Sequence, residues 1–211
     1  MLLHGRFVKK FLFSALLTGL FLGVLFLGGY AVKEQASIAG SVLRLHIIGN
    51  TNTDIDQALK LLVRDSILKE HRNLFANATS AQDAAIKASL AAFSIADTAE
   101  KTLQQHGCLA PVTVRVEETS FPTKEYGNVR LPAGTYTAVN VRLGSSTGKN
   151  WWCVLYPPLC LTEGSLKADD ETLAMLQKEL SPNEYAMITQ PEKITFRMKF
   201  RILELLGEIF G

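Results

Sequence analysis

The hydrophobic and polar positions of the chain alternate in some segments and follow a helical period in others. Alternation predicts five strands, at residues 42–49, 112–117, 135–143, 151–156 and 194–201. Helical spacing of apolar residues predicts four helices, at residues 55–67, 80–105, 168–180 and 202–209. This order predicts an α+β fold, with an antiparallel or mixed sheet of about five strands and helices packed mainly on one face.

Several details of these elements can be stated in advance. The first strand places Leu43, Leu45 and Ile47 on one face and Arg44 and His46 on the other, which is typical of a strand with a single buried face. The strands at residues 135–143 and 151–156 are expected to be antiparallel neighbours, joined by a hairpin turn at residues 144–150.

The helix ends also carry recognisable signals. Asp54 and Gln57 have the spacing of a capping box and predict a helix that starts at about Ile55. Ser80 and Asp83 predict the start of a second, uninterrupted helix to residue 105, and a left-handed Gly107 would end it.

The N-terminal segment predicts export. Residues Phe11 to Val32 are uncharged, and as a helix these 22 residues would span about 33 Å, enough to cross a bilayer. Basic residues precede the run, so the positive-inside rule places the N-terminus in the cytoplasm. We expect residues 1–39 to form a signal peptide or a membrane anchor and residues 40–211 to form a single domain.

Composition narrows the functional class. The net charge is +2, and from Lys33 onward 19 basic residues face 20 acidic ones, so no basic surface indicates nucleic-acid binding. The chain also lacks a Ser-His-Asp order, a His-rich metal spacing and a nucleotide fingerprint. We therefore expect no metal, no small-molecule cofactor and no partner nucleic acid.

Residues 121–160 contain both tryptophans and two of the three cysteines. The connection at residues 118–133 is expected to be an ordered loop. Trp151 and Trp152 are adjacent in a strand and should point to opposite faces, one into the core and the other towards a helix, this loop or a partner.

Cys153 has two interpretations. A disulfide with Cys160 needs only the Pro157-Pro158 turn to bring the two residues together, and an exported protein permits it. Alternatively, Cys153 is a nucleophile with His46 as its base, in a cysteine-dependent hydrolase or transferase. The expected compartment favours the disulfide.

Three segments resemble the stage II sporulation protein R family. They are SFPTKEYGNVRLPAGTY at residues 120–136, GKNWWCVLYPPLC at residues 148–160 and LRLHIIGNTNTDIDQALKLLVRDSI at residues 43–67. The ending ITFRMKFRILELLGEIF is similar but looser.

The resemblance implies a secreted signalling protein rather than an enzyme. Such a protein is made in the forespore, crosses into the space between the forespore and mother-cell membranes, and triggers a membrane-embedded aspartic-type protease that processes pro-sigma-E. No catalytic residue is implied. We expect the partner-binding residues to be Phe121, Pro122, Lys124, Tyr126, Gly127, Asn128, Trp151 and Trp152.

Overall fold

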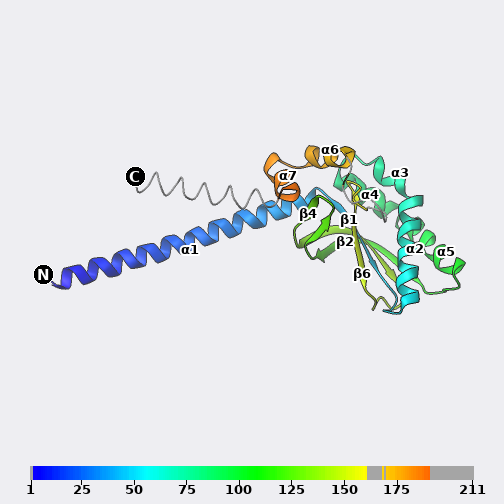
Figure 1. The fold of residues 1–211 in the computed structure, drawn as a ribbon, viewed down its shortest axis with the longest axis horizontal. Helices are drawn as coiled ribbons and strands as arrows, with labels where there is room; N and C mark the ends of the chain where they lie inside the picture. The colour runs from blue at the N-terminus through cyan, green and yellow to red at the C-terminus, as the bar shows by residue number, and fades with distance from the viewer. Residues whose placement is uncertain (1, 161–167, 169, 191–211) are drawn as a thin grey trace. The chain divides into compact units, whose positions relative to one another are not determined.

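The structure is a computed structural model that describes residues 2–160, 168 and 170–190. The strand and helix expected at residues 194–201 and 202–209 lie outside these described residues. The chain divides into two compact units, Met1–Ala36 and Ser37–Gly211. Figure 1 traces the elements in chain order.

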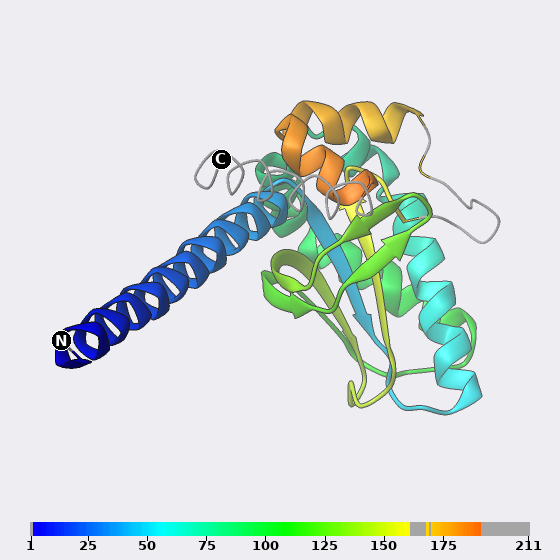
Figure 2. The same ribbon diagram turned by 60° about the vertical axis from the view of Figure 1, so that its left-hand side comes forward.

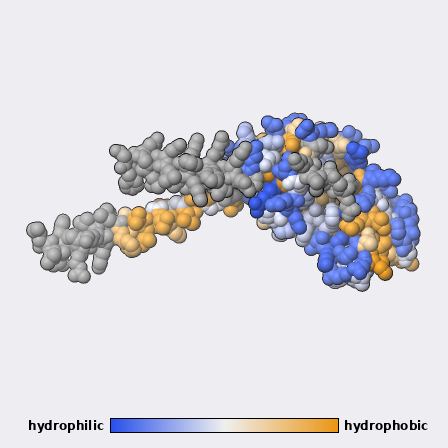
Figure 3. Space-filling view, viewed as in Figure 1, coloured by the Kyte–Doolittle hydropathy of each residue, from blue (hydrophilic) through white to orange (hydrophobic). Residues whose placement is uncertain are grey.

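The N-terminal unit consists of helix α1 (Leu2–Gly40), whose last turn belongs to the second unit. The large apolar side chains from Phe13 to Leu27 are exposed, and Figure 3 shows them as an orange band along the helix. By length and composition, this helix is able to cross a membrane, and a signal sequence has the same properties. An apolar N-terminal helix therefore fits a signal peptide or an anchor.

The second unit is built on a mixed four-stranded sheet. Strands β1 (Leu43–Ile48), β2 (Val112–Phe121), β5 (Gly134–Leu143) and β6 (Asn150–Tyr156) lie in the order β2-β5-β1-β6. Strand β1 is parallel to β5 and antiparallel to β6, and β2 is antiparallel to β5. The predicted α+β class is confirmed.

The expected pairing of β5 with β6 is wrong, because β1 lies between them. The connection at residues 144–149 is therefore not a hairpin turn but passes the end of β1. It is held there by hydrogen bonds from Gly49 N to Lys149 O (3.3 Å) and from Thr147 N to Asn50 O (3.1 Å). Alternation identified both strands, but it carries no information about which strand is inserted between them.

The connection at residues 118–133 is ordered. Strand β2 extends through its first residues, and the remainder forms a separate two-stranded hairpin of β3 (Lys124–Tyr126) and β4 (Val129–Leu131). Gly127 at the hairpin tip has φ +61°, in the left-handed region where glycine is favoured. Figure 2 shows this hairpin, in green, lying across one face of the sheet.

The other face of the sheet is covered by helices, as expected. Helix α4 (Ala81–Leu90) contacts β1, β2 and β5, while α5 (Ala92–Gln105) contacts β2 and α2 (Asp54–Glu70). A short helix α3 (Arg72–Ala76) follows α2. The core on this side comprises Leu45, Ile47, Leu59, Val63, Ile67, Ala84, Ala88, Ile95, Ala99, Val139 and Val141.

Two helix boundaries differ from the sequence prediction. The N-cap of α2 is Thr53, whose hydroxyl accepts from Asp56 N, so the helix starts at Asp54. The helix expected over residues 80–105 is broken at Ala91 into α4 and α5. Alanine is a good helix former, so the break has no local signal. It separates α4, which contacts β1, β2 and β5, from α5, which contacts β2 and α2.

Other predicted helix ends are confirmed. The Ser80 hydroxyl caps α4 by accepting from Asp83 N, and Gly107 is left-handed with φ +74°. Helix α6 (Asp170–Glu179) lies within the predicted range. It is followed by α7 (Pro182–Thr189), which the sequence did not predict and which contacts β4 of the hairpin.

Candidate partner-binding surface

The polar face of β1 is buried, in contrast to the single buried face expected from its alternation. Arg44 is 0% exposed and His46 is 8% exposed. Both side chains lie on the face of the sheet that the β3–β4 hairpin covers. The correction has a tertiary cause, because the hairpin that excludes water from them comes from about 80 residues further along the chain.

Arg44 lies among aromatic rings. Its guanidinium carbon is 3.9 Å from the centroid of Phe121, 4.8 Å from that of Tyr136 and 5.8 Å from that of Tyr126. Nη2 donates a hydrogen bond of 2.5 Å to Tyr126 Oη, whereas Nε and Nη1 have no partner among the described residues. Burial lowers the pKa of Arg44, an effect that Tyr126 partly opposes. The cation is thus held by ring faces and one hydroxyl, and it fixes the hairpin to β1.

His46 belongs to a buried polar chain beside this cluster. Its Nδ1 lies 2.7 Å from Asn140 Oδ1, and Asn140 Nδ2 donates to Thr119 Oγ1 at 2.7 Å. Because Asn140 Oδ1 can only accept, this orientation places a proton on His46 Nδ1. The ring also stacks on Trp152, with centroids 6.0 Å apart. The His46 ring therefore packs against one face of the Trp152 indole.

The two tryptophans point to opposite faces of β6, as expected for adjacent strand residues. Trp151 lies under the Arg64 guanidinium of α2 at 4.3 Å, and Trp152 lies under Lys124 Nζ of the hairpin at 4.4 Å. Both are half-buried, so neither is a full core residue. The indole Nε1 atoms of both are buried and have no hydrogen-bond partner among the described residues.

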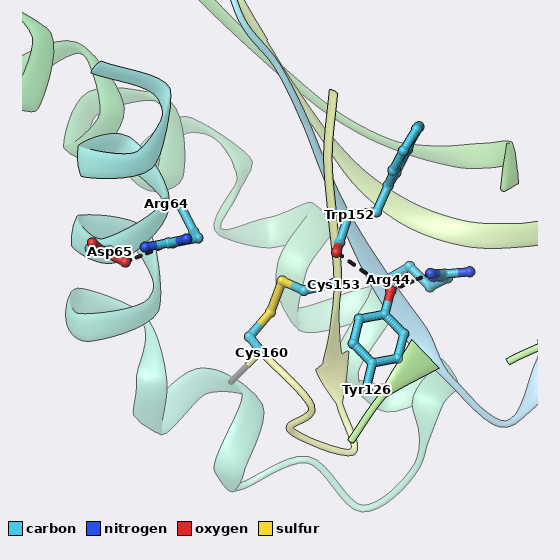
Figure 4. Close-up of a disulfide and its surroundings, with 7 residues drawn as sticks. All are labelled: Arg44, Arg64, Asp65, Tyr126, Trp152, Cys153 and Cys160. Atoms are coloured by element: carbon cyan, nitrogen blue, oxygen red, sulfur yellow. Dashed lines mark hydrogen bonds and ion pairs between the residues drawn. A yellow bond between two sulfur atoms is a disulfide. The ribbon is translucent and has the colours of Figure 1, made fainter. Parts of the chain in front are cut away.

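A groove of about 460 Å³ runs between the hairpin and this end of β6. Its walls are residues 124–127 of the hairpin, residues 150–153 of β6 and Leu159. Strand β6 is an edge strand, and its outer side has no strand partner in the described part of the chain. There, Leu159 N donates to Val154 O at 3.1 Å, and Tyr126 Oη donates to Trp152 O at 3.4 Å. Figure 4 shows Tyr126 between Arg44 and the Trp152 carbonyl.

The predicted disulfide between Cys153 and Cys160 is present, with 5.1 Å between the two Cα atoms. The alternative pair of a Cys153 nucleophile and a His46 base is not brought together. The Cys153 sulfur is bonded to Cys160, and Cys153 is opposite Leu45 in the strand register, whereas His46 is opposite Trp152. Successive residues of a strand face opposite ways, so the two side chains lie on different faces of the sheet.

Known proteins match the part of the chain that forms this surface. The family model described as "Stage II sporulation protein R" matches residues 39–165. The chain belongs to this family. It is 39% identical over 135 residues to stage II sporulation protein R of Bacillus subtilis (strain 168), an alignment that covers 63% of this chain and 59% of that protein. No solved structure matches the chain.

The name of the family and of this relative refers to stage II of sporulation. In the described part of the chain no group of three His, Cys, Asp or Glu side chains is placed to hold a metal ion. The matched residues 39–165 include the hairpin, the tryptophans and the disulfide. The residues that line the groove thus lie within the part of the chain that matches the family model.

The predicted partner-binding residues occupy three different positions. Phe121 and Tyr126 are buried, 3% and 9% exposed, and serve the cluster around Arg44. Those that line the groove are Lys124, Tyr126, Gly127, Trp151 and Trp152. Pro122 and Asn128 are exposed beside it, and Asn128 Oδ1 accepts from Ala168 N at 3.1 Å.

Sequence reasoning predicted Lys124 but missed Arg64, the cation that covers Trp151, and the nearby Lys60. Arg64 is a buried residue of α2, and its Nε also pairs with Asp65 Oδ1 at 2.7 Å. Lys60 is buried near it, and burial, with the charges of Lys149 and Arg64, lowers the pKa of Lys60. One feature of the sequence could have identified Lys60 and Arg64. They lie next to Leu59 and Val63 on the buried side of a helix, where charged residues are unusual.

Proposed function

We propose that this protein is an exported sporulation signal that acts by binding, without catalysis of its own. Its partner is a membrane-embedded aspartic-type protease that processes pro-sigma-E, and it meets this partner in the space between the forespore and mother-cell membranes. Membership of the sporulation family supports the process. The apolar N-terminal helix supports export, with the protein released or anchored.

We further propose that the groove beside the tryptophans contacts the partner. The observation that carries this proposal concerns Trp151 and Trp152, which are half-buried and each covered by a cation. The indole N–H of each lacks an acceptor among the described residues. Buried indole groups normally find a hydrogen-bond partner, and tryptophan and arginine are enriched where binding energy concentrates in interfaces. A partner that supplies acceptors here would satisfy groups that the described chain leaves unpaired.

The groove also offers backbone groups. On the outer side of β6 the Trp152 and Val154 carbonyls already accept hydrogen bonds within the chain, and an extended segment of a partner can bind to the remaining main-chain groups of this edge. Lys124 stands over Trp152 at the mouth of the groove. A partner carboxylate at this point would meet Lys124, which has no ion pair among the described residues.

The test is Lys124→Glu in a sporulating host that has no other copy of this gene. The lysine covers Trp152 but is only half-buried, so its reversal should leave the fold intact. We expect processing of pro-sigma-E, followed by immunoblot, to fall at least about tenfold, because the change puts a like charge against an acidic partner group.

Two controls make the result decisive. Lys178→Glu makes the same reversal on the exposed last turn of α6 and should leave processing unchanged. The exported amount of each variant is measured by immunoblot of the same cells. Normal processing with Lys124→Glu, at normal protein level, would refute the proposed surface. Normal processing in a strain that lacks the gene altogether would refute the proposed function.

A further inference from the structure

The opposite edge of the sheet is open as well. Strand β2 is the other edge strand and pairs with β5 through all ten of its residues. The described chain supplies no strand on its outer side. A long uncovered edge invites pairing with another chain, and proteins usually shorten, twist or cover such edges. In the sheet order β2-β5-β1-β6, two strands separate this edge from β6, so it is distinct from the groove discussed above.

Large apolar side chains gather next to the middle of this edge. A hollow of about 420 Å³ is lined by Ile86 and Leu90 of α4, by Val116 of β2 and by polar residues that include Glu118. Ile86 is 51% exposed and Leu90 is 84% exposed. Single exposed apolar residues are ordinary, but several beside an open strand edge indicate an interface.

The charges on β2 identify the occupant of this edge. We propose that two copies of this chain associate by antiparallel pairing of their β2 strands around a two-fold axis at Val116. In this register Arg115 of each copy lies opposite Glu117 of the other, so two opposite-charge pairs form. Glu117 already accepts from Arg142 Nη2 at 2.7 Å, and Arg115 is exposed and extends the same row of charges.

Neighbouring registers do not have this complementarity. With the axis at Arg115, the two arginines would face each other. With the axis at Glu117, the two glutamates would face each other. Like charges directly opposite destabilise strand pairing, so the charges select one register for a second copy of this chain.

The apolar residues agree with the same axis. Val116 is opposite the buried Val139 of β5 and therefore points to the helix-covered face of the sheet. Pairing at Val116 would bring the two hollows together on that face. Ile86 and Leu90 of both copies would then be covered by each other.

Cysteine cross-linking of the full chain in sporulating host cells tests this pairing. The free Cys108 is first changed to Ala, which leaves the Cys153–Cys160 bond in place. Val116→Cys in this background puts a thiol on the axis. Directly opposite residues of an antiparallel pair have Cα atoms about 4.5–5.5 Å apart, within reach of a disulfide. We expect a dimer band on a non-reducing gel after mild oxidation.

The matched control is Ser120→Cys, also on β2 and exposed. In the proposed register its two copies would be about 27 Å apart, eight residues at about 3.4 Å each, so no dimer band should form. Equal cross-linking of both variants would overturn the register. Absence of a dimer band for Val116→Cys, or a band only with a different host protein, would overturn self-association.

Charge exchange gives a second, independent test. Added to Val116→Cys, the change Arg115→Glu should lower the cross-linked fraction at least about fivefold, because it places two glutamates opposite each other. The double change Arg115→Glu with Glu117→Arg should restore it. An unchanged fraction in the single variant, or no restoration in the double variant, would contradict the proposed pairing. These assays measure association only, so they are independent of the proposed signalling role.

Discussion

Tyr126→Phe removes a single oxygen atom from the contact that holds the hairpin on the sheet. That oxygen accepts the 2.5 Å hydrogen bond of Arg44 Nη2, while Nε and Nη1 of the same guanidinium have no partner among the described residues. Arg44 is 0% exposed, so water cannot replace the lost acceptor. Hydrogen bonds to buried charged groups contribute about 1.5–3 kcal/mol. We expect Tyr126→Phe to lower the free energy of unfolding by about 2–3 kcal/mol, measured by urea denaturation and tryptophan fluorescence.

A double-mutant cycle tests the reasoning behind this value. Arg44→Met removes the charge but keeps an unbranched side chain among the rings, and the remaining Tyr126 hydroxyl retains Trp152 O as an acceptor at 3.4 Å. In that background Tyr126→Phe should cost less than about 1 kcal/mol, a typical value for a neutral hydrogen bond. The coupling energy between the two positions should therefore be at least about 1 kcal/mol. An equal cost of Tyr126→Phe in both backgrounds would show that the charge does not depend on this hydroxyl.

Three further outcomes concern stability alone. Replacing Cys153 and Cys160 by Ala opens a loop with a sequence separation of 7 and should lower the free energy of unfolding by about 2.5 kcal/mol. A reducing agent should cause the same loss in the unaltered protein and should not change the stability of the variant. Burial, with help from a neighbouring carboxylate, raises the pKa of Tyr156 to about 12. Above about pH 10 the folded state therefore binds more protons than the unfolded state, so the free energy of unfolding should fall between about pH 10 and 12. Tyr156→Phe should flatten that part of the pH profile of stability. Gly107→Ala should lower the free energy of unfolding, measured by urea denaturation, by about 1–2 kcal/mol, because Gly107 has a left-handed backbone. Gly144→Ala should lower it further, because the added methyl group would also collide with a neighbouring side chain. Equal losses for the two variants would contradict the steric argument.

Only some features of the site could be predicted from the pattern of residues along the chain. Alternation correctly separated Trp151 from Trp152, because the direction of strand side chains is a local property. It also placed Arg44 and His46 together on one face of β1. It could not show that this face is buried, because the covering hairpin is distant in sequence and has only three residues in each strand. The predicted partner residues Phe121 and Tyr126 are consequently engaged in holding that hairpin.

The sequence by itself determined the features that depend on neighbours along the chain. These are the apolar N-terminal helix, the four strands of the main sheet, the Ser80 cap, the left-handed Gly107 and the Cys153–Cys160 bond, whose partners are joined by a short turn. Only the tertiary structure decided that β1 lies between β5 and β6, that the helix over residues 80–105 breaks at Ala91, and that cations cover both tryptophans. The physical reason is that strand order and burial are set by contacts between distant segments, whereas periodicity records only which residues share a face.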